Sequence, residues 1–499
     1  MKRSKFSLSN TKLLSCDLGE LIPCGLTEIL PGDSIQQSTS CMVRFSPLLA
    51  PVMHPTHVQL AHWFVPHRLV WEEWEDFITG GPDGNNASEF PIIETPASTG
   101  FGVGTLADYL GVPTGVADLA VSALPFRGYA LIWNEWYRDQ DLQSELTIDR
   151  TSGEDTTTST SLQRAAWEKD YFTSSRPWEQ KGPQITIPIG DEAPVLGIGT
   201  DASQSFTGTA SIALRESGMT SPTTTTFQPY KPVFDTSNRL FIEGTGSPAY
   251  PYIRADLSEA SAITVTRLRE ALALQRFEEA RARFGSRYVE YLRYLGVRSS
   301  DARLQRPEFL GGGRYPVQFS EVLQTAEGSN PVGELRGHGI GVARSNRYRR
   351  FFEEHGYVFT FLVVKPRTMY VQGLPRTWNR RTKEDFFQKE LQHIGQQEVL
   401  NKEVYAAHAQ PQGVFGYQDR YDEYRRAEST IAGEFRTTLK YWHFGRQFAS
   451  DPALNSTFVS CVPTEEPFAV PSEDVLYIMA RHSIQARRLV AGSGQSFIY

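Results

Sequence analysis

Short runs of β-branched and aromatic residues recur along this chain and are separated by long polar stretches. The runs with the strongest strand character cover residues 56–65, 357–365, 434–442, 456–462 and 474–484. Few of them follow one another closely enough to be joined by a tight turn, which disfavours a β-meander. Strands dispersed in this way predict a Greek-key or jelly-roll sandwich whose connections have grown into subdomains.

One of these connections has the spacing of an amphipathic helix. In the segment RGYALIWNEWYRDQ, residues 127–140, five large side chains recur at the spacing that places them on one helix face: Tyr129, Ile132, Trp133, Trp136 and Tyr137. We expect this stripe to lie in the core or at a subunit interface, because a ligand site is a rarer use of such a pattern.

Further helices are predicted in the second half of the chain. Residues 258–284 are rich in Ala, Leu, Glu and Arg, and a second piece that begins near Tyr288 should end at Gly296. Another helix is predicted to begin near Thr382, with Asp385 completing a variant capping pair.

The overall composition is that of a soluble globular protein. The 499 residues are 40% hydrophobic and 21% charged, and a chain of this length suggests roughly three domains. Four cysteines match no zinc-ligand spacing, and we interpret them as reduced thiols. The basic N-terminus is followed by no apolar stretch, and the longest apolar run, residues 357–364, is far too short for a bilayer. Neither a signal peptide nor membrane insertion is expected.

Four of the ten histidines fall within residues 54–67. If this stretch is a strand, His57 and His62 point to opposite faces, and His54 and His67 lie beside prolines where the strand ends. Because zinc needs converging ligands, we expect no metal site here. A pH-sensitive contact or a divalent cation that modulates the protein stays open.

Catalytic signatures are missing from the sequence. The glycines of RGHGIGVA, residues 336–343, do not form a dinucleotide fingerprint, and no P-loop, GxSxG or HExxH motif occurs. We therefore expect neither an enzyme nor a bound cofactor.

Positive charge is concentrated locally, although the chain as a whole has a net charge of −7. Residues 340–383 contain ten Lys or Arg and two acids, interleaved with aromatic residues, and the N-terminal arm is basic as well. Such a pattern is typical of protein interfaces, and it also suits single-stranded nucleic acid. The candidates for contact with DNA are Lys2, Arg3, Lys5, Lys12, Arg344, Arg347, Arg349, Arg350, Arg380 and Arg381.

The sharpest change of composition covers residues 200–226, where 13 of 27 residues are Ser or Thr. A segment this polar buries little apolar surface, and we expect it at an exposed tip or in a mobile loop.

Long aromatic-rich phrases resemble the major capsid protein of the Microviridae, small single-stranded DNA bacteriophages, and specifically the gokushovirus-like branch. In chain order the phrases are LPGDS (30–34), FVPHRLVWEEWEDF (64–77), LPFRGYALIWNEWYRDQDLQ (124–143), DYFTSSRPWEQKGP (170–183), DARLQRPEFLGGG (301–313), EHGYVFTFLVVKPRTMYVQGLPRTWNRRTKEDF (354–386), HIGQQEVLNKEVY (393–405) and VFGYQDRYDEYRR (414–426). Residues 190–250 resemble no phrase of the family, so host specificity does not carry over.

The resemblance implies an eight-stranded antiparallel jelly roll with large, partly helical insertions. Sixty copies would close a T=1 icosahedral shell around a circular single-stranded DNA genome, in a virion assembled in the bacterial cytoplasm. The implied partners are other copies of the chain, the genome, a small basic DNA-condensing protein, an internal scaffolding protein, a DNA pilot protein and a host cell-surface receptor.

The resemblance also implies a division of the chain. Residues 1–45 would form an N-terminal arm and first strand region, 46–184 strands with a helical insertion, 185–256 a surface protrusion at the threefold axes, and 257–499 a helical insertion with the remaining strands. Candidates for subunit interfaces are Trp71, Trp74, Trp133, Trp136 and Trp378. Candidates for host attachment are Thr207, Thr209, Thr223, Thr224, Thr225 and Thr226.

Two other functions remain open from the residues alone. The basic segment and the basic N-terminus would suit a single-stranded DNA-binding protein that forms no capsid. The abundant aromatic residues and paired acids would suit a carbohydrate-binding or enzymatic β-sandwich.

Overall fold

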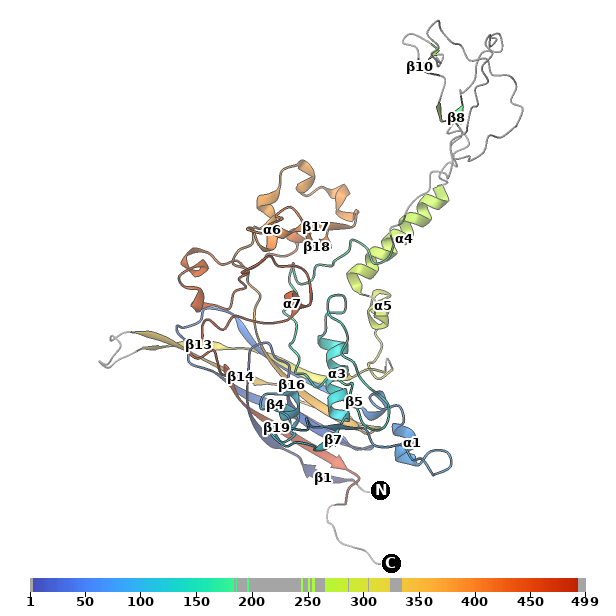
Figure 1. The fold of residues 1–499 in the computed structure, drawn as a ribbon, viewed down its shortest axis with the longest axis vertical. Helices are drawn as coiled ribbons and strands as arrows, with labels where there is room; N and C mark the ends of the chain where they lie inside the picture. Colours follow the sequence, from blue (N-terminus) through green and yellow to red (C-terminus); the bar gives the residue numbers. More distant parts are fainter. Residues whose placement is uncertain are drawn as a thin grey trace, which may run out of the picture. The chain divides into compact units, whose positions relative to one another are not determined.

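The computed structural model describes residues 3–183, 185, 195–196, 244–245, 250–251, 254–255, 265–285, 287–303, 305–323 and 334–491 (Figure 1). The chain divides into two compact units, one formed by Met1–Lys181 with Glu279–Tyr499 and the other by Gly182–Glu278. The candidate site lies in the first unit, which contains both large sheets.

The larger sheet has seven strands, and each of its pairings is antiparallel. Its central strands are β19 (Leu476–Arg488) and β4 (Ser34–Phe45), which pair along most of their length. The others are β1 (Ser4–Ser7), β2 (Asn10–Cys16), β13 (Gln318–Leu323), β14 (Leu335–Arg344) and β15 (Tyr348–Phe351). β1 and β2 pair with β19, and β14 and β15 pair with β4, so residues from both ends of the chain meet in this sheet.

The second sheet has four antiparallel strands in the order β12-β5-β16-β3. They are β3 (Ile22–Ile29), β5 (Thr56–Pro66), β12 (Glu308–Pro316) and β16 (Gly356–Pro366). β5, β16 and β19 confirm the strands predicted at 56–65, 357–365 and 474–484. Mainly antiparallel sheets make this a β protein of the kind expected for a viral capsid sandwich.

The space between the two sheets is filled by two apolar clusters with polar side chains between them. One cluster includes Val43, Leu60 and Ile478, and the other includes Ile35 and Phe64. The polar side chains are buried, and each is hydrogen-bonded to another of the set: Gln37, Thr39, His62, Ser345, Tyr348, Thr360 and His482. Buried polar groups are stable when they are paired in this way.

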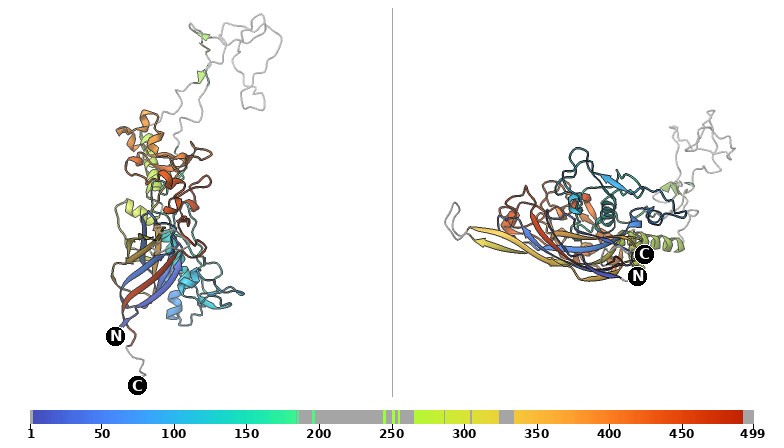
Figure 2. Two further views of the ribbon diagram at one scale, coloured as in Figure 1. Left: turned by 90° about the vertical axis from the view of Figure 1, so that its left-hand side faces the viewer. Right: turned by 90° about the horizontal axis from the view of Figure 1, so that it is seen from below.

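Helix α3 (Leu124–Ile132), continued by the π-helical turn η2 (Trp133–Tyr137), covers the outer side of the four-stranded sheet. Its apolar stripe packs on residues such as Trp63 and Phe361, which confirms the core alternative for the predicted helix face. Gly128 allows this close approach, because a Cβ there would lie 2.7 Å from the buried ring of Phe359. Figure 2 shows the segment with α3 on one side of the sandwich and the strands of the seven-stranded sheet on the opposite side.

Helices, 3-10 turns and short strands occupy the connections between the strands of the two sheets. The helices are α1 (Trp74–Thr79), α2 (Leu106–Leu110), α4 (Val265–Phe284), α5 (Tyr288–Tyr294), α6 (Asn401–Val404) and α7 (Ser456–Val459). The 3-10 turns are η1 (His67–Leu69), η3 (Arg376–Asn379), η4 (Lys383–Asp385), η5 (Lys389–His393), η6 (Asp422–Tyr424), η7 (Gly433–Arg436) and η8 (Lys440–Trp442). The short strands pair as β6 (Ile92–Glu94) with β7 (Ala120–Ser122), β8 (Val195–Leu196) with β11 (Arg254–Ala255), β9 (Gly244–Thr245) with β10 (Tyr250–Pro251), and β17 (Gln396–Leu400) with β18 (Val414–Asp419).

Helices α4 and α5 confirm the predicted helical region over 265–284 and the piece that begins at Tyr288. Gly296, with φ +79°, follows α5 as expected. The predicted helix near Thr382 is a single 3-10 turn, although Thr382 and Asp385 form the expected capping pair. Among the described residues, no helix is both long and apolar enough to cross a membrane.

Two predicted strands were wrong. Residues 434–442 form the turns η7 and η8, in which the guanidinium of Arg436 donates to the carbonyl of Ile431 at 2.7 Å. Residues 456–462 contain helix α7, whose first turn is capped by the Asn455 side chain, which accepts from the amide of Phe458 at 2.9 Å. Local side-chain hydrogen bonds outweigh strand propensity in both segments.

Candidate nucleic-acid interface

The outer face of the seven-stranded sheet is basic and lacks acidic side chains along six of its strands. Strands β1, β2, β4, β14, β15 and β19 contain no Asp or Glu. Alternation along the strands directs seven exposed basic side chains outward. Arg336 pairs with Glu334 at 2.6 Å, and the other six are Lys5, Arg44, Arg344, Arg349, Arg481 and Arg487. None of the six forms an ion pair with a residue that the structure describes. Positive groups left unpaired on one face can bind phosphate.

The cross-strand register sets the order of side chains on this face. Arg481 on β19 lies opposite Ser40 on β4, and Ser40 lies opposite Arg344 on β14. In the same way, Tyr477 lies opposite Arg44. Residues separated by hundreds of positions in sequence therefore form continuous rows across the sheet.

The structure gives different environments to the basic residues predicted at the N-terminus. Lys5 points outward on β1, opposite Arg487. Arg3 lies beside this face, where its guanidinium is 5.5 Å from the centre of the Phe351 ring. Lys2 lies outside the described residues.

Lys12 does not belong to the basic face. It pairs opposite Ala480, whose side chain points into the sandwich, and its ammonium donates to the carbonyl of Tyr109. Burial lowers the pKa of Lys12. An ammonium held inside the sandwich cannot reach a phosphate at the outer face, so the structure argues against the predicted DNA contact.

The Arg-rich segment between β14 and β15 divides in a similar way. Arg344 and Arg349 are exposed on the basic face, and Arg347 is exposed in the loop between the two strands. Arg350 instead forms an ion pair with Glu308 of the other sheet at 2.9 Å. Alternation along β15 accounts for the difference between neighbours.

Arg380 and Arg381 lie in the 376–424 segment rather than on the sheet. The guanidinium of Arg380 lies 4.5 Å from the centre of the Tyr424 ring and 3.7 Å from the carboxylate of Glu423. Arg381 is exposed and donates to the carbonyl of Trp378 at 3.1 Å. The structure therefore does not bring this pair together with the other predicted DNA contacts.

The predicted interface tryptophans differ in how much surface they leave free. Trp71 and Trp133 are buried in the core around α3, so the chain itself covers them. Trp74 and Trp136 are partly buried against the same core. Trp378 is 70% exposed and is the member of the set with most surface available to a neighbouring molecule.

The histidines of residues 54–67 do not converge. His62 lies between the sheets, where its two ring nitrogens bond Thr360 and Ser345, each at 2.9 Å. His57 lies on the other face of β5 and contacts Arg314 at 3.1 Å, as strand alternation predicts. Burial lowers the pKa of His62 to about 3 and those of His54 and His67 to about 4. The described residues contain no cluster of three potential metal ligands.

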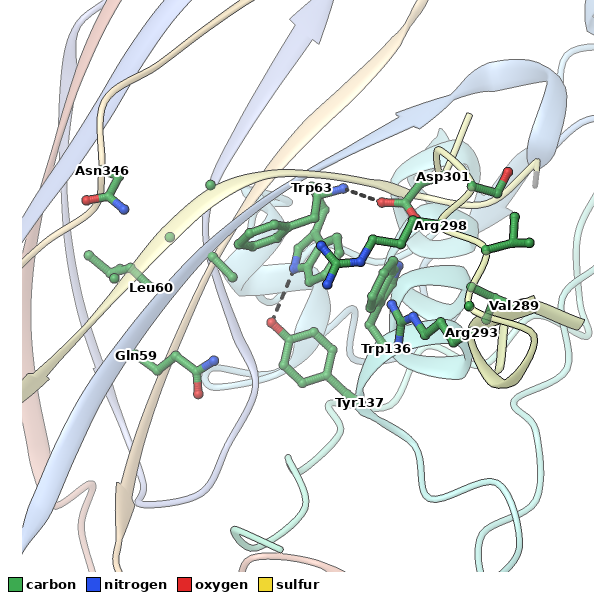
Figure 3. Close-up of a pocket in the computed structure, with 18 residues that line it drawn as sticks. Gln59, Leu60, Trp63, Trp136, Tyr137, Val289, Arg293, Arg298, Asp301 and Asn346 are labelled. Atoms are coloured by element: carbon green, nitrogen blue, oxygen red, sulfur yellow. Dashed lines mark hydrogen bonds between the residues drawn. The ribbon is translucent and has the colours of Figure 1, made fainter. Parts of the chain in front are cut away.

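A hollow of about 1140 Å³ lies beside β12, on the side of the sandwich that carries α3 (Figure 3). Its lining includes Trp63, Trp136, Arg293, Arg298, Asp301 and Phe309. The indole N–H groups of Trp63 and Trp136 donate to the Tyr137 hydroxyl at 3.2 Å and to a backbone carbonyl at 3.1 Å. Asp301 is paired with Arg306 at 2.6 Å. The hollow therefore offers ring faces and two arginines, and its one lining carboxylate is already engaged.

Sequence reasoning missed Arg44, Arg481 and Arg487. A signal was present for Arg481, because 474–484 was predicted as a strand and its alternation places Tyr477, Met479 and Arg481 on the polar side. Arg44 lies in β4, whose polar stretch SIQQSTS lacks strand character. The threonines predicted for host attachment, Thr207, Thr209, Thr223, Thr224, Thr225 and Thr226, lie outside the described residues.

Comparison with known proteins identifies the family. The family model described as capsid protein (F protein) matches residues 1–493. Capsid protein VP1 of Bdellovibrio phage phiMH2K is 36% identical over 95% of this chain and 90% of its own length. Capsid protein VP1 of Chlamydia phage 1 is 33% identical over 95% of this chain and 92% of its own, and that of Spiroplasma virus 4 is 34% identical over 92% and 87%. The chain therefore belongs to the phage capsid protein (F protein) family of the Microviridae.

Proposed function

We propose that this chain is the major capsid protein of a small phage, and that sixty copies close a T=1 icosahedral shell around a circular single-stranded DNA genome. The observation that carries the proposal is similarity to VP1 capsid proteins along almost the whole chain. A structural role of this kind needs no catalytic site. The carbohydrate-binding and non-capsid alternatives have no comparable support.

The strand order supports an eight-stranded jelly roll as the shell-forming unit. Strands β2, β19, β4 and β14 are neighbours in one sheet, and β3, β16, β5 and β12 are neighbours in the other. Along the chain, β2 to β5 alternate between the two sheets, and β12 to β19 return to pair beside them. A double Greek key of the viral jelly-roll type would produce this alternation, which supports the proposal.

The basic face supports a position toward the genome. Six exposed basic side chains without described ion-pair partners would lie on the inner surface of the shell, where they offset part of the phosphate charge. Because the chain's net charge is −7, most of the phosphate charge of the genome must be neutralised by other molecules. This requirement supports a small basic DNA-condensing protein as a partner. Scaffolding and pilot proteins would act during assembly in the host cytoplasm.

The long connections support contacts with neighbours and host. The chain between β5 and β12 runs from residue 67 to 307, and it holds the polar segment 200–226. We place this segment on the outside of the virion, where its threonines would meet a host receptor. Trp378 would lie at a subunit contact, because its ring is 70% exposed and tryptophan is enriched at protein interfaces.

The experiment that tests the function is expression of the chain together with the other structural genes of its phage. Lysates are separated on a density gradient, and each fraction is imaged by electron microscopy and assayed for nuclease-resistant single-stranded DNA. Uniform icosahedral particles that contain this chain and protected DNA are expected. Soluble monomer in every fraction, with no particles, would contradict the proposal.

A further inference from the structure

An apolar row crosses the basic face of the seven-stranded sheet. The register places Leu13, Met479, Met42 and Val342 directly opposite one another on β2, β19, β4 and β14. Leu13 is 78% exposed, Met479 40% and Val342 65%. With strands about 4.8 Å apart, the row extends about 14 Å across the sheet. Contiguous exposed apolar side chains usually mark a binding surface.

Basic side chains flank this row on both sides. On one side of the row lie Arg481, two residues after Met479, and Arg344, two residues after Val342. On the other side lie Tyr477, two residues before Met479, and Arg44, two residues after Met42. The distance between successive same-face positions is about 6.8 Å. The surface is therefore an apolar strip with guanidinium groups along each edge, one of which also carries a phenol ring.

The charge of the surface restricts what can cover it. A second copy of the same face would bring unpaired arginines against arginines, and like charges in contact oppose association. The strands offer no carboxylate with which to bind a basic partner. An anionic ligand with flat, weakly polar faces matches both the strip and its edges.

Single-stranded DNA has this chemistry. Its unpaired bases can lie with their faces over apolar and aromatic side chains while its phosphates meet arginines. In a duplex the bases are stacked and paired inside, so only the phosphates could reach the surface. The surface thus discriminates between the two forms of DNA without reading a sequence.

We propose that the row Leu13–Met479–Met42–Val342 is a base-binding strip for single-stranded DNA, with Arg44, Arg344 and Arg481 holding the phosphates along its edges. This inference rests on the proposed function, and it adds the residues that distinguish single-stranded from duplex DNA. A short stretch of DNA would cross the strands of the sheet rather than run along them.

The test uses the full-length unassembled chain and a fluorescein-labelled oligothymidylate, with affinity measured by anisotropy. The double variant Leu13→Ser, Met479→Ser should bind the oligonucleotide about tenfold more weakly, because base stacking is lost. Its affinity for a duplex of the same length should stay unchanged. Arg481→Gln should weaken both and reduce the slope of log Kd against log salt by about 0.7 for single strands.

Matched controls lie away from the strip. Val103→Ser removes an apolar side chain that is 84% exposed, and Arg303→Gln removes an exposed arginine outside the sheet. Both should bind as the unaltered chain does, and circular dichroism should show that every variant is folded.

Three outcomes would contradict the proposal that this row binds the bases of single-stranded DNA. Equal affinity of the double variant and the unaltered chain for oligothymidylate would mean that the surface binds DNA through its charges alone. Tighter binding to phosphatidylglycerol vesicles than to oligothymidylate would assign the strip to lipid. Equal loss of duplex binding in the double variant would mean that the bases are not the contact. Particle formation, measured separately in the gradient experiment, tests the proposed function independently of these results.

Discussion

His62 on β5 and Ser345, in the loop between β14 and β15, are joined by a 2.9 Å hydrogen bond in the interior between the two sheets. The other ring nitrogen of His62 bonds the Thr360 hydroxyl, also at 2.9 Å. Since the imidazole is fully buried, both bonds form out of contact with water, and each partner would be costly to leave unpaired. Ser345 belongs to the seven-stranded sheet's β14–β15 loop, and His62 belongs to the four-stranded sheet. The bond therefore links the two sheets.

The first prediction concerns pH. Burial depresses the folded-state pKa of His62 to about 3, and those of His54 and His67 to about 4, below the unfolded value near 6.5. The unfolded chain therefore binds more protons than the folded chain below pH 6.5. The free energy of unfolding should therefore fall as pH drops from 6.5 toward 4. Each histidine contributes a loss of about 1.4 kcal/mol per pH unit between its unfolded and its folded pKa.

The carboxyl group of Glu428 acts in the opposite direction, and it provides the control. Burial raises the pKa of Glu428 to about 7, so this group gains stability on protonation as pH falls. In urea unfolding at pH 7.5 and 5.5, the loss of stability should be smaller in His62→Gln and larger in Glu428→Gln than in the unaltered chain. Identical losses in all three proteins would show that these groups do not set the pH dependence.

The second prediction concerns a buried ion pair beneath α3. Arg127 and Asp155 are both fully buried and lie 2.7 Å apart. Replacing one partner leaves the other charge unpaired in the core, so Arg127→Met should cost about 3–5 kcal/mol in the free energy of unfolding. The exposed pair Lys440–Glu466, at 2.6 Å, is the control, and Lys440→Met should cost less than about 1 kcal/mol. Equal costs for the two variants would contradict this account.

The third prediction concerns the polar segment 200–226. Shortening it should leave particle yield on a density gradient unchanged and reduce adsorption of phage to host cells, because we assign it to host attachment. Replacement of the segment by a Gly/Ser linker of equal length is the control for connection length. Loss of particles in both variants would instead assign the segment to assembly.

The fourth prediction separates two neighbouring arginines. Arg380→Glu should impair assembly or DNA packaging, because it places a carboxylate beside Glu423 and removes the cation from the Tyr424 ring. Arg381→Glu tests the exposed member alone, and an effect on protected DNA without an effect on particle yield would assign it to packaging. Normal particles with full DNA content in both variants would show that Arg380 and Arg381 are needed neither for assembly nor for DNA packaging.

The sequence predicted the strands whose hydrophobic pattern is complete within one segment. β5, β16 and β19 are long and rich in β-branched and aromatic residues, so their local pattern suffices. β4 and β14 were missed because their polar and glycine-rich segments, SIQQSTS and RGHGIG, resemble loops. Their strand conformation depends on neighbours in the sheet, which a local pattern does not contain.

The candidate site was less predictable than the fold, for a related reason. Of the residues predicted to contact DNA, Arg344 and Arg349 are exposed on the outer face of the sheet, whereas alternation along β2 points Lys12 inward. The row that includes Leu13 and Met479 exists only through the pairing of β2 with β19, which are separated by most of the chain. Register of this kind is set by tertiary packing rather than by any single segment.

The central claim is tested most directly by a cryo-electron microscopy reconstruction of particles purified from infected or co-expressing cells. We predict a closed T=1 shell of sixty copies in which the seven-stranded sheet turns its basic face toward the DNA. A shell in which that face points to the outside, or an assembly without icosahedral closure, would contradict the account.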